Sequence, residues 1–181
     1  MDPDQLRKIL QSGFVTDTLF RLFHPQHLRT VSRFNRTDEP GSTIVGHADP
    51  KTGTVTLRKD LGARAVPVLE HEVGHLYADS LFNRNPTPSA EDRKVFATIF
   101  PALDSLRAVK HPSIEQQHAA SNASELAATA FAHALQAIRL PPAQRDSAIA
   151  AADKVIPGTA AFAKFLMQRL KNMPLASSGS Q

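Results

Sequence analysis

The chain of 181 residues contains no cysteine and no tryptophan, and it has only one tyrosine. Without cysteine it cannot form disulfides, Cys-type zinc fingers or thiol nucleophiles, so histidine and carboxylate side chains are the zinc ligands that remain. The absence fits a cytosolic protein, and equally a protein that unfolds to pass through a narrow secretion channel. Because ten phenylalanines supply nearly all of the aromatic side chains, aliphatic and alanine packing must build most of the core.

Long apolar segments are also missing. No apolar run approaches the roughly 18 residues that a membrane span requires, so we expect no membrane-embedded segment. Residues 1–5, with the sequence MDPDQ, are acidic and lack the apolar core of a signal peptide. The sequence therefore predicts a cytoplasmic protein, or one that is secreted by a route that does not use a signal peptide.

The charge balance gives little support for a nucleic-acid partner. The formal net charge is +4, and charged residues make up 21% of an otherwise ordinary globular composition. Arg29, Arg33 and Arg36 could form a small basic patch, but no aromatic interleaving or recognised nucleic-acid motif accompanies them. We therefore expect no nucleic-acid partner, and we keep a basic nucleic-acid-binding protein only as a third hypothesis. Steeply salt-dependent binding to DNA or RNA would be required for it.

The residue patterns predict an α+β domain that is mostly helical, with a small β-hairpin before its central helix. The length fits one domain over residues 1–172, with a core at about 42–138 and a disordered serine-rich tail over 173–181. Residues 42–48 and 54–58 are short β-type runs, and a proline and a glycine lie between them. We therefore predict a hairpin with a five-residue loop over residues 49–53, in which Gly53 takes a positive φ.

Helical periodicity and breaker residues predict the other elements. The expected helices cover residues 3–11, 15–23, 66–79, 123–138, 143–154 and 159–171, with a further helix from 89 that ends before Pro101, a short helical turn at 104–109, and loops at 30–42 and 83–90.

The predicted central helix carries one H-E-x-x-H motif, formed by His71, Glu72 and His75. Residues four apart in a helix lie on the same face, one turn apart. The two histidines could therefore offer two imidazoles to one tetrahedral zinc ion, with Glu72 beside the open coordination position. The alternative is an ordinary amphipathic helix with exposed histidines.

The remaining residues of this helix separate a core face from the motif. Leu69, Val73 and Leu76 form one apolar stripe beside the flank that holds the histidines. Tyr77, two residues past His75, is predicted to point away from that flank. Gly74 costs the helix about 1 kcal/mol relative to alanine, which suggests that another backbone approaches closely there.

A catalytic zinc site needs a third protein ligand. In metzincins a glycine and a histidine follow the motif after three and six residues, but these positions hold Ala78 and Leu81, which argues against that class. Asp79 lies one turn beyond His75, and we expect it to accept a hydrogen bond from a ligand imidazole rather than to bind the metal.

The better candidate for the third ligand is Glu125, 50 residues after His75 and on a separate alanine-rich helix. Asn122 is a good N-cap residue for that helix. The alternative role for Glu125 is that of a capping-box carboxylate that reaches back to the cap.

Residues 125–131, with the sequence ELAATAF, resemble the glutamate helix of gluzincin metallopeptidases. The order of a hairpin, the H-E-x-x-H helix and then the glutamate helix is similar as well. Within that group, residues 71–75 (HEVGH) resemble the H-E-x-G-H of the minimal gluzincins, which include the catalytic domain of anthrax lethal factor and related bacterial toxin peptidases. Asn122 and Glu125 match the capped start of their third-ligand helix, and the resemblance covers about residues 42–135.

This resemblance implies a zincin-like fold and the activity of a zinc-dependent metalloendopeptidase that acts on a protein or peptide substrate. It also suggests that the protein is a secreted bacterial effector or toxin. His71, His75 and Glu125 would bind Zn²⁺, Glu72 would be the general base, and a hairpin strand would pair with an extended substrate. The toxin family carries a tyrosine seven residues before the glutamate, where this chain has His118, whose imidazole could stabilise the oxyanion instead. The substitution keeps open a second hypothesis, a non-catalytic zinc-binding or regulatory module.

Overall fold

The computed structural model describes residues 27–31, 44–83 and 90–172. Within these ranges the elements are β1 (His27–Val31), β2 (Gly46–Asp49), β3 (Thr54–Arg58), the 3-10 turn η1 (Gly62–Arg64), α3 (Ala65–Asn83), α4 (Ala90–Ala97), α5 (Ile99–Arg107), α6 (Ile114–Ala119), α7 (Ala123–Ile138), α8 (Pro142–Val155) and α9 (Thr159–Asn172). The predicted α+β class, mostly helical with a small sheet, is confirmed. The helices predicted over 3–11 and 15–23 and the tail over 173–181 lie outside the described residues.

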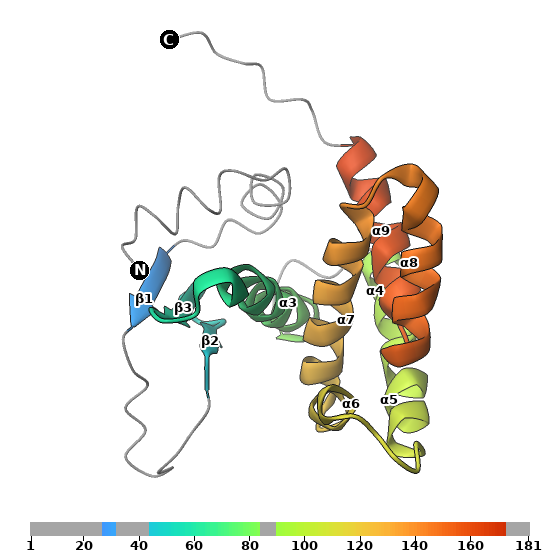
Figure 1. Cartoon of the computed structure of the whole chain (residues 1–181), viewed down its shortest axis with the longest axis horizontal. Helices are drawn as coiled ribbons and strands as arrows, with labels where there is room; N and C mark the ends of the chain where they lie inside the picture. The colour runs from blue at the N-terminus through green and yellow to red at the C-terminus, as the bar shows by residue number, and fades with distance from the viewer. Residues whose placement is uncertain (1–26, 32–43, 84–89, 173–181) are drawn as a thin grey trace, which may run out of the picture.

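In Figure 1 the small sheet lies on one side of α3 and the other helices lie on the opposite side. α3 therefore joins the two parts of the domain, because it packs on β2 and β3 as well as on α7. None of the helices in the described ranges is both long enough and apolar enough to cross a bilayer.

The sheet contains three described strands, with β3 in the centre. β2 pairs with β3 in the antiparallel sense, which confirms the predicted hairpin. Asp49 still belongs to β2, so the loop is one residue shorter than predicted, and Gly53 has the expected positive φ of 65°. Val55 and Leu57 are buried and alternate with less buried residues, since successive side chains of a strand point to opposite faces.

The prediction of a loop from residue 30 was wrong at its start, because Thr30 and Val31 belong to β1. β1 runs parallel to β3, and Thr30 pairs with Leu57. Parallel strands are joined by long connections rather than by a tight turn, so this pairing leaves no local turn signal in the sequence.

The core face of α3 is as predicted. Leu69 and Val73 are buried, and Leu76 is partly buried against the core. Tyr77 is only 3% exposed and packs away from the motif, against the aromatic rings of Phe131, Phe162 and Phe165.

α7 has the predicted bounds and is the central helix of the bundle. Asn122 caps it, since its Oδ1 accepts the backbone N–H of Glu125 at 3.0 Å. Its alanines are buried against α3, α8 and α9, as a helix that is apolar on most faces requires. The small side chains also allow the close approach predicted at Gly74, where an added Cβ would lie 2.7 Å from the Cα of Ala128.

The segment between α4 and α7 differs from its prediction. The predicted helix from residue 89 is interrupted at Thr98 and not at Pro101. Pro101 lies in the first turn of α5, where its missing N–H removes no helical hydrogen bond. α5 extends to Arg107 as one helix. α6 was not predicted, although Ser113 and Gln116 form a capping box at its start. α8 and α9 lie within one or two residues of their predicted bounds.

Candidate metal centre

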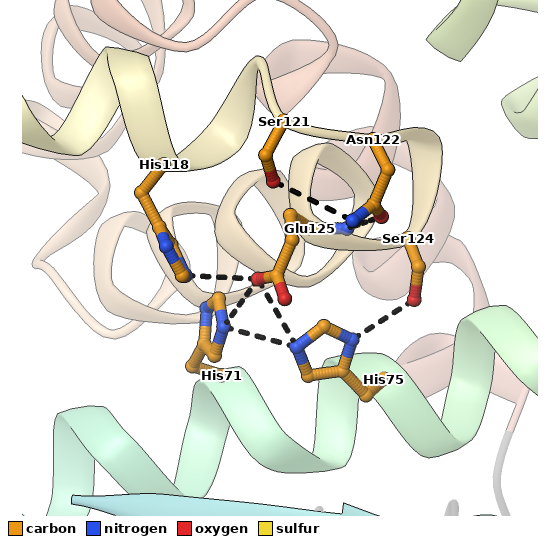
Figure 2. Close-up of polar contacts among 7 residues, drawn as sticks. All are labelled: His71, His75, His118, Ser121, Asn122, Ser124 and Glu125. Atoms are coloured by element: carbon orange, nitrogen blue, oxygen red, sulfur yellow. Dashed lines mark hydrogen bonds and ion pairs between the residues drawn. The ribbon is translucent and has the colours of Figure 1, made fainter. Parts of the chain in front are cut away.

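Three histidines and one carboxylate meet where α3, α6 and α7 come together (Figure 2). The Oε2 atom of Glu125 lies 3.2 Å from Nε2 of His71, 3.3 Å from Nε2 of His75 and 2.9 Å from Nε2 of His118. The Nε2 atoms of the two motif histidines are 3.1 Å apart. All four predicted side chains therefore face one point, although they come from three helices.

These groups could hold a metal ion. His71, His118 and Glu125 each offer a ligand atom within 4.8 Å of the other two. His75 adds a second motif imidazole at the distances given above. The alternative role of Glu125 as a capping-box carboxylate is not favoured, because its Oε2 is directed at the histidines (Figure 2).

Ser124 orients one of the imidazoles. Its Oγ shares a hydrogen bond of 2.9 Å with Nδ1 of His75, which leaves Nε2 facing Glu125. The sequence interpretation missed Ser124; its position in the first turn of α7, beside the candidate ligand, was the available signal. Asp79 lines the same cavity, and its role as an acceptor for a ligand imidazole stays a prediction.

The pKa values of the residues in this cluster are shifted in different directions. Burial lowers the pKa of His71. Burial acts against protonation of His75 as well, but the hydrogen bond to Glu125 raises its pKa overall. Partial burial disfavours the Glu125 carboxylate, yet the hydrogen bonds from His71 and His75 outweigh it and lower the pKa of Glu125. The cluster thus holds Glu125 as an anion, which is the form that binds metals.

Glu72, the remaining residue of the motif, is only 7% exposed. Its carboxylate accepts a hydrogen bond from the backbone N–H of Ala48 in β2, and burial raises the pKa of Glu72 to about 7. Gly46 allows β2 to pass this close, because a Cβ there would lie 2.6 Å from both Oε1 of Glu72 and Cγ1 of Val68. The hairpin therefore supplies both the cover and a hydrogen-bond donor for the glutamate.

The cluster opens into a cavity of about 830 Å³. Its lining includes residues of α3 from Pro67 to Asp79 and residues 44–48 of the hairpin. His47 lines this cavity and is exposed. The site is thus a cleft between a strand and a helix, with the histidine–carboxylate cluster in its wall.

The fold and the site together define a mostly helical α+β domain with a histidine–carboxylate cluster in a cleft. Comparisons with protein-family models, with curated proteins and with solved structures found no match for this chain.

Proposed function

We propose that the protein is a zinc-dependent metalloendopeptidase of the gluzincin type. His71, His75 and Glu125 are the metal ligands in this proposal, and Glu72 is the general base. The observation that supports this proposal is the triangle formed by one donor atom from each of the three ligands.

The Nε2 atoms of His71 and His75 and the Oε2 atom of Glu125 are separated by 3.1, 3.2 and 3.3 Å. Zinc binds nitrogen and oxygen ligands at about 2.0–2.1 Å, so neighbouring ligands of a tetrahedral site lie roughly 3.3 Å apart. The three donors therefore have the spacing of one face of such a tetrahedron. The hydrogen bond between Nδ1 of His75 and Oγ of Ser124 fits as well, because a zinc-bound histidine usually donates its other ring N–H to a neighbouring acceptor.

Zinc bound at this position would supply a water of lowered pKa and would polarise the scissile carbonyl. The protein itself must then move protons. Glu72 takes the proton of the attacking water and returns it to the amine that leaves. Burial raises the pKa of Glu72, which favours uptake of the proton, and the N–H of Ala48 donates a hydrogen bond to the carboxylate.

The shape of the cleft supports an extended peptide substrate. The lining residues of α3 run from Pro67 to Asp79, a rise of about 18 Å along the helix axis. That length accommodates about five residues of extended chain. Within the described sheet β2 is an edge strand, and Gly46, His47 and Ala48 all line the cleft, so we expect the substrate to add to this edge.

Zinc analysis of three purified variants tests the ligands and the base separately. The wild-type chain should bind one zinc ion, Glu125→Ala should lose most of it, and Glu72→Ala should keep it. His111→Ala, at an exposed position outside the cavity lining, is the control.

Hydrolysis is then followed by mass spectrometry on a mixed peptide library. We expect cleavage by the wild type and the control, and none by Glu72→Ala. Cleavage by Glu72→Ala at the wild-type rate would exclude this assignment of the base, and a zinc-free wild type would exclude the metal site.

A second candidate is a non-catalytic zinc-binding or regulatory module. The position of His118 favours it, because a fourth protein ligand closes a zinc site to water, as in structural sites. Stoichiometric zinc without hydrolysis of any library peptide would support this second function.

A further inference from the structure

His118 is a further imidazole beside the proposed ligands Glu125 and His71. Its Nε2 lies 2.9 Å from Oε2 of Glu125, and its ring centroid lies 5.5 Å from that of His71. With His71 and Glu125 it forms a set of ligand atoms that all lie within 4.8 Å of one another. The cleft therefore presents four donor groups and not three (Figure 2).

The fourth donor is held differently from the other three. The side chains of His71, His75 and Glu125 are 21%, 17% and 22% exposed and come from two long helices packed on each other. The side chain of His118 is 58% exposed and comes from the last turn of α6, which has six residues. A ring so exposed loses few contacts when it rotates away.

The α6 backbone is fixed without help from His118. Glu115 forms an ion pair of 2.7 Å with His133 of α7, and Nε2 of Gln116 donates to the carbonyl of Val155 at 3.0 Å. Arg107 donates to the carbonyl of Ala120 just after the helix. The imidazole can therefore move by side-chain rotation alone while α6 stays in place.

We propose that His118 is a displaceable fourth ligand, which completes the donor set in the substrate-free protein and leaves it when a peptide carbonyl arrives. The inference rests on the proposed function, since it assumes a zinc ion held by His71, His75 and Glu125. Four protein ligands would leave no position for the attacking water, whereas the buried Glu72 is proposed to act as a base on that water. A fourth ligand that can be displaced is compatible with both. The free protein is then capped by its own side chain, and the substrate must compete with that cap.

X-ray absorption at the zinc edge counts the imidazoles bound to the metal, and it tests the proposal without an activity assay. The zinc-loaded full chain should show three imidazoles in the wild type and in the control His111→Ala, and two in His118→Ala. The zinc dissociation constant should rise by at least about 10-fold in His118→Ala. His118→Ala is expected to fold, because none of the hydrogen bonds that hold α6 use this side chain; circular dichroism checks this.

Acetohydroxamate, a small chelator of zinc, tests displacement. At saturation it should lower the imidazole count of the wild type from three to two, and it should bind more tightly to His118→Ala, where no cap competes.

Two imidazoles in the zinc-loaded wild type, with an unchanged dissociation constant in His118→Ala, would overturn this inference and leave the proposed function intact. Three imidazoles that persist with acetohydroxamate bound would overturn the displacement. A wild-type chain without zinc would overturn both proposals together.

Discussion

Gly74 of α3 lies against the backbone of Ala128 of α7, so closely that a Cβ on Gly74 would come within 2.7 Å of the Cα of Ala128 and 3.0 Å of its carbonyl oxygen. Gly74 lies within the motif of α3, and Ala128 lies three residues after Glu125 on α7. The contact therefore sets the separation of the two helices that carry the proposed ligands.

Gly74→Ala should weaken zinc binding even though alanine is the better helix former. Alanine gains about 1 kcal/mol of helix propensity, but overpacking of this kind costs roughly 1–3 kcal/mol, and the helices must separate to relieve it. We expect a higher zinc dissociation constant by calorimetry. Gly62→Ala is the control: its φ of +53° makes alanine strained, but no atom lies within 4 Å of the added Cβ. It should lose stability and keep its zinc affinity; equal zinc affinities in all three proteins would contradict the prediction.

Gly46→Ala should reduce hydrolysis without removing zinc. The added Cβ would meet Oε1 of Glu72 at 2.6 Å, so the carboxylate must shift. A displacement of about 1 Å in a catalytic group can lower the rate by roughly 10²-fold. Lys51→Ala, at an exposed residue of the same hairpin that does not line the cavity, is the control for kcat. If kcat is the same for Gly46→Ala and the wild type, the position of this carboxylate does not govern the rate.

Ser124→Ala should raise the zinc dissociation constant by about 10–100-fold, because the hydrogen bond to Nδ1 of His75 orients the ring and fixes its tautomer. Ser121→Ala is the matched control, since Ser121 is exposed and lies one residue before the helix cap. Competition with a fluorescent zinc chelator measures both constants. A similar constant for the two variants would show that Ser124 does not support the metal site.

The pKa of Glu72 predicts how the metal-free protein responds to pH. Burial raises this pKa from 4.5 to about 7, so between these values the folded protein binds a proton that the unfolded chain has released. The free energy of unfolding should therefore fall as the pH rises through this interval, by up to about 3 kcal/mol.

Urea unfolding of the metal-free wild type and of Glu72→Gln, at pH 5 and at pH 8, measures this effect. The variant lacks the titration and should lose less stability between the two pH values, while His75 titrates in both proteins. The same loss in both would mean that Glu72 is not protonated in the folded state.

An ion pair joins Glu70 of α3 to Arg139, the C-cap residue of α7, whose side chain is 31% exposed. Glu70 is fully buried, so Arg139→Ala should leave an unpaired charge and lower the free energy of unfolding by about 3 kcal/mol. The double variant Glu70→Leu/Arg139→Leu should be closer to the wild type, because no charge is left buried. Thermal unfolding compares the variants, and a double variant less stable than Arg139→Ala would contradict this account.

The sequence was sufficient wherever short-range patterns decide the structure. The alanine-rich composition and the Asn122 cap predicted α7 with its observed bounds, and the turn residues predicted the hairpin. The four-residue spacing of His71 and His75 put both imidazoles on one face, and the glycine at position 74 indicated the close helix contact.

Other features depend on contacts between distant segments and leave little local trace. The parallel pairing of β1 with β3 has no turn to mark it. The hydrogen bond between Ser124 and His75 and the cover that Gly46 provides for Glu72 require the packing of α3 with α7 and with β2.

The two proposed ligands on α3 and their spacing were thus determined by the sequence alone, because a helix fixes the relation of residues one turn apart. The tertiary structure decided that Glu125 meets them at the distance of neighbouring metal ligands. It also decided that His118, which the sequence suggested for the oxyanion, lies 2.9 Å from Glu125, where we propose that it acts as a fourth donor. Such distances depend on how three helices pack, and no periodicity within one helix can specify them.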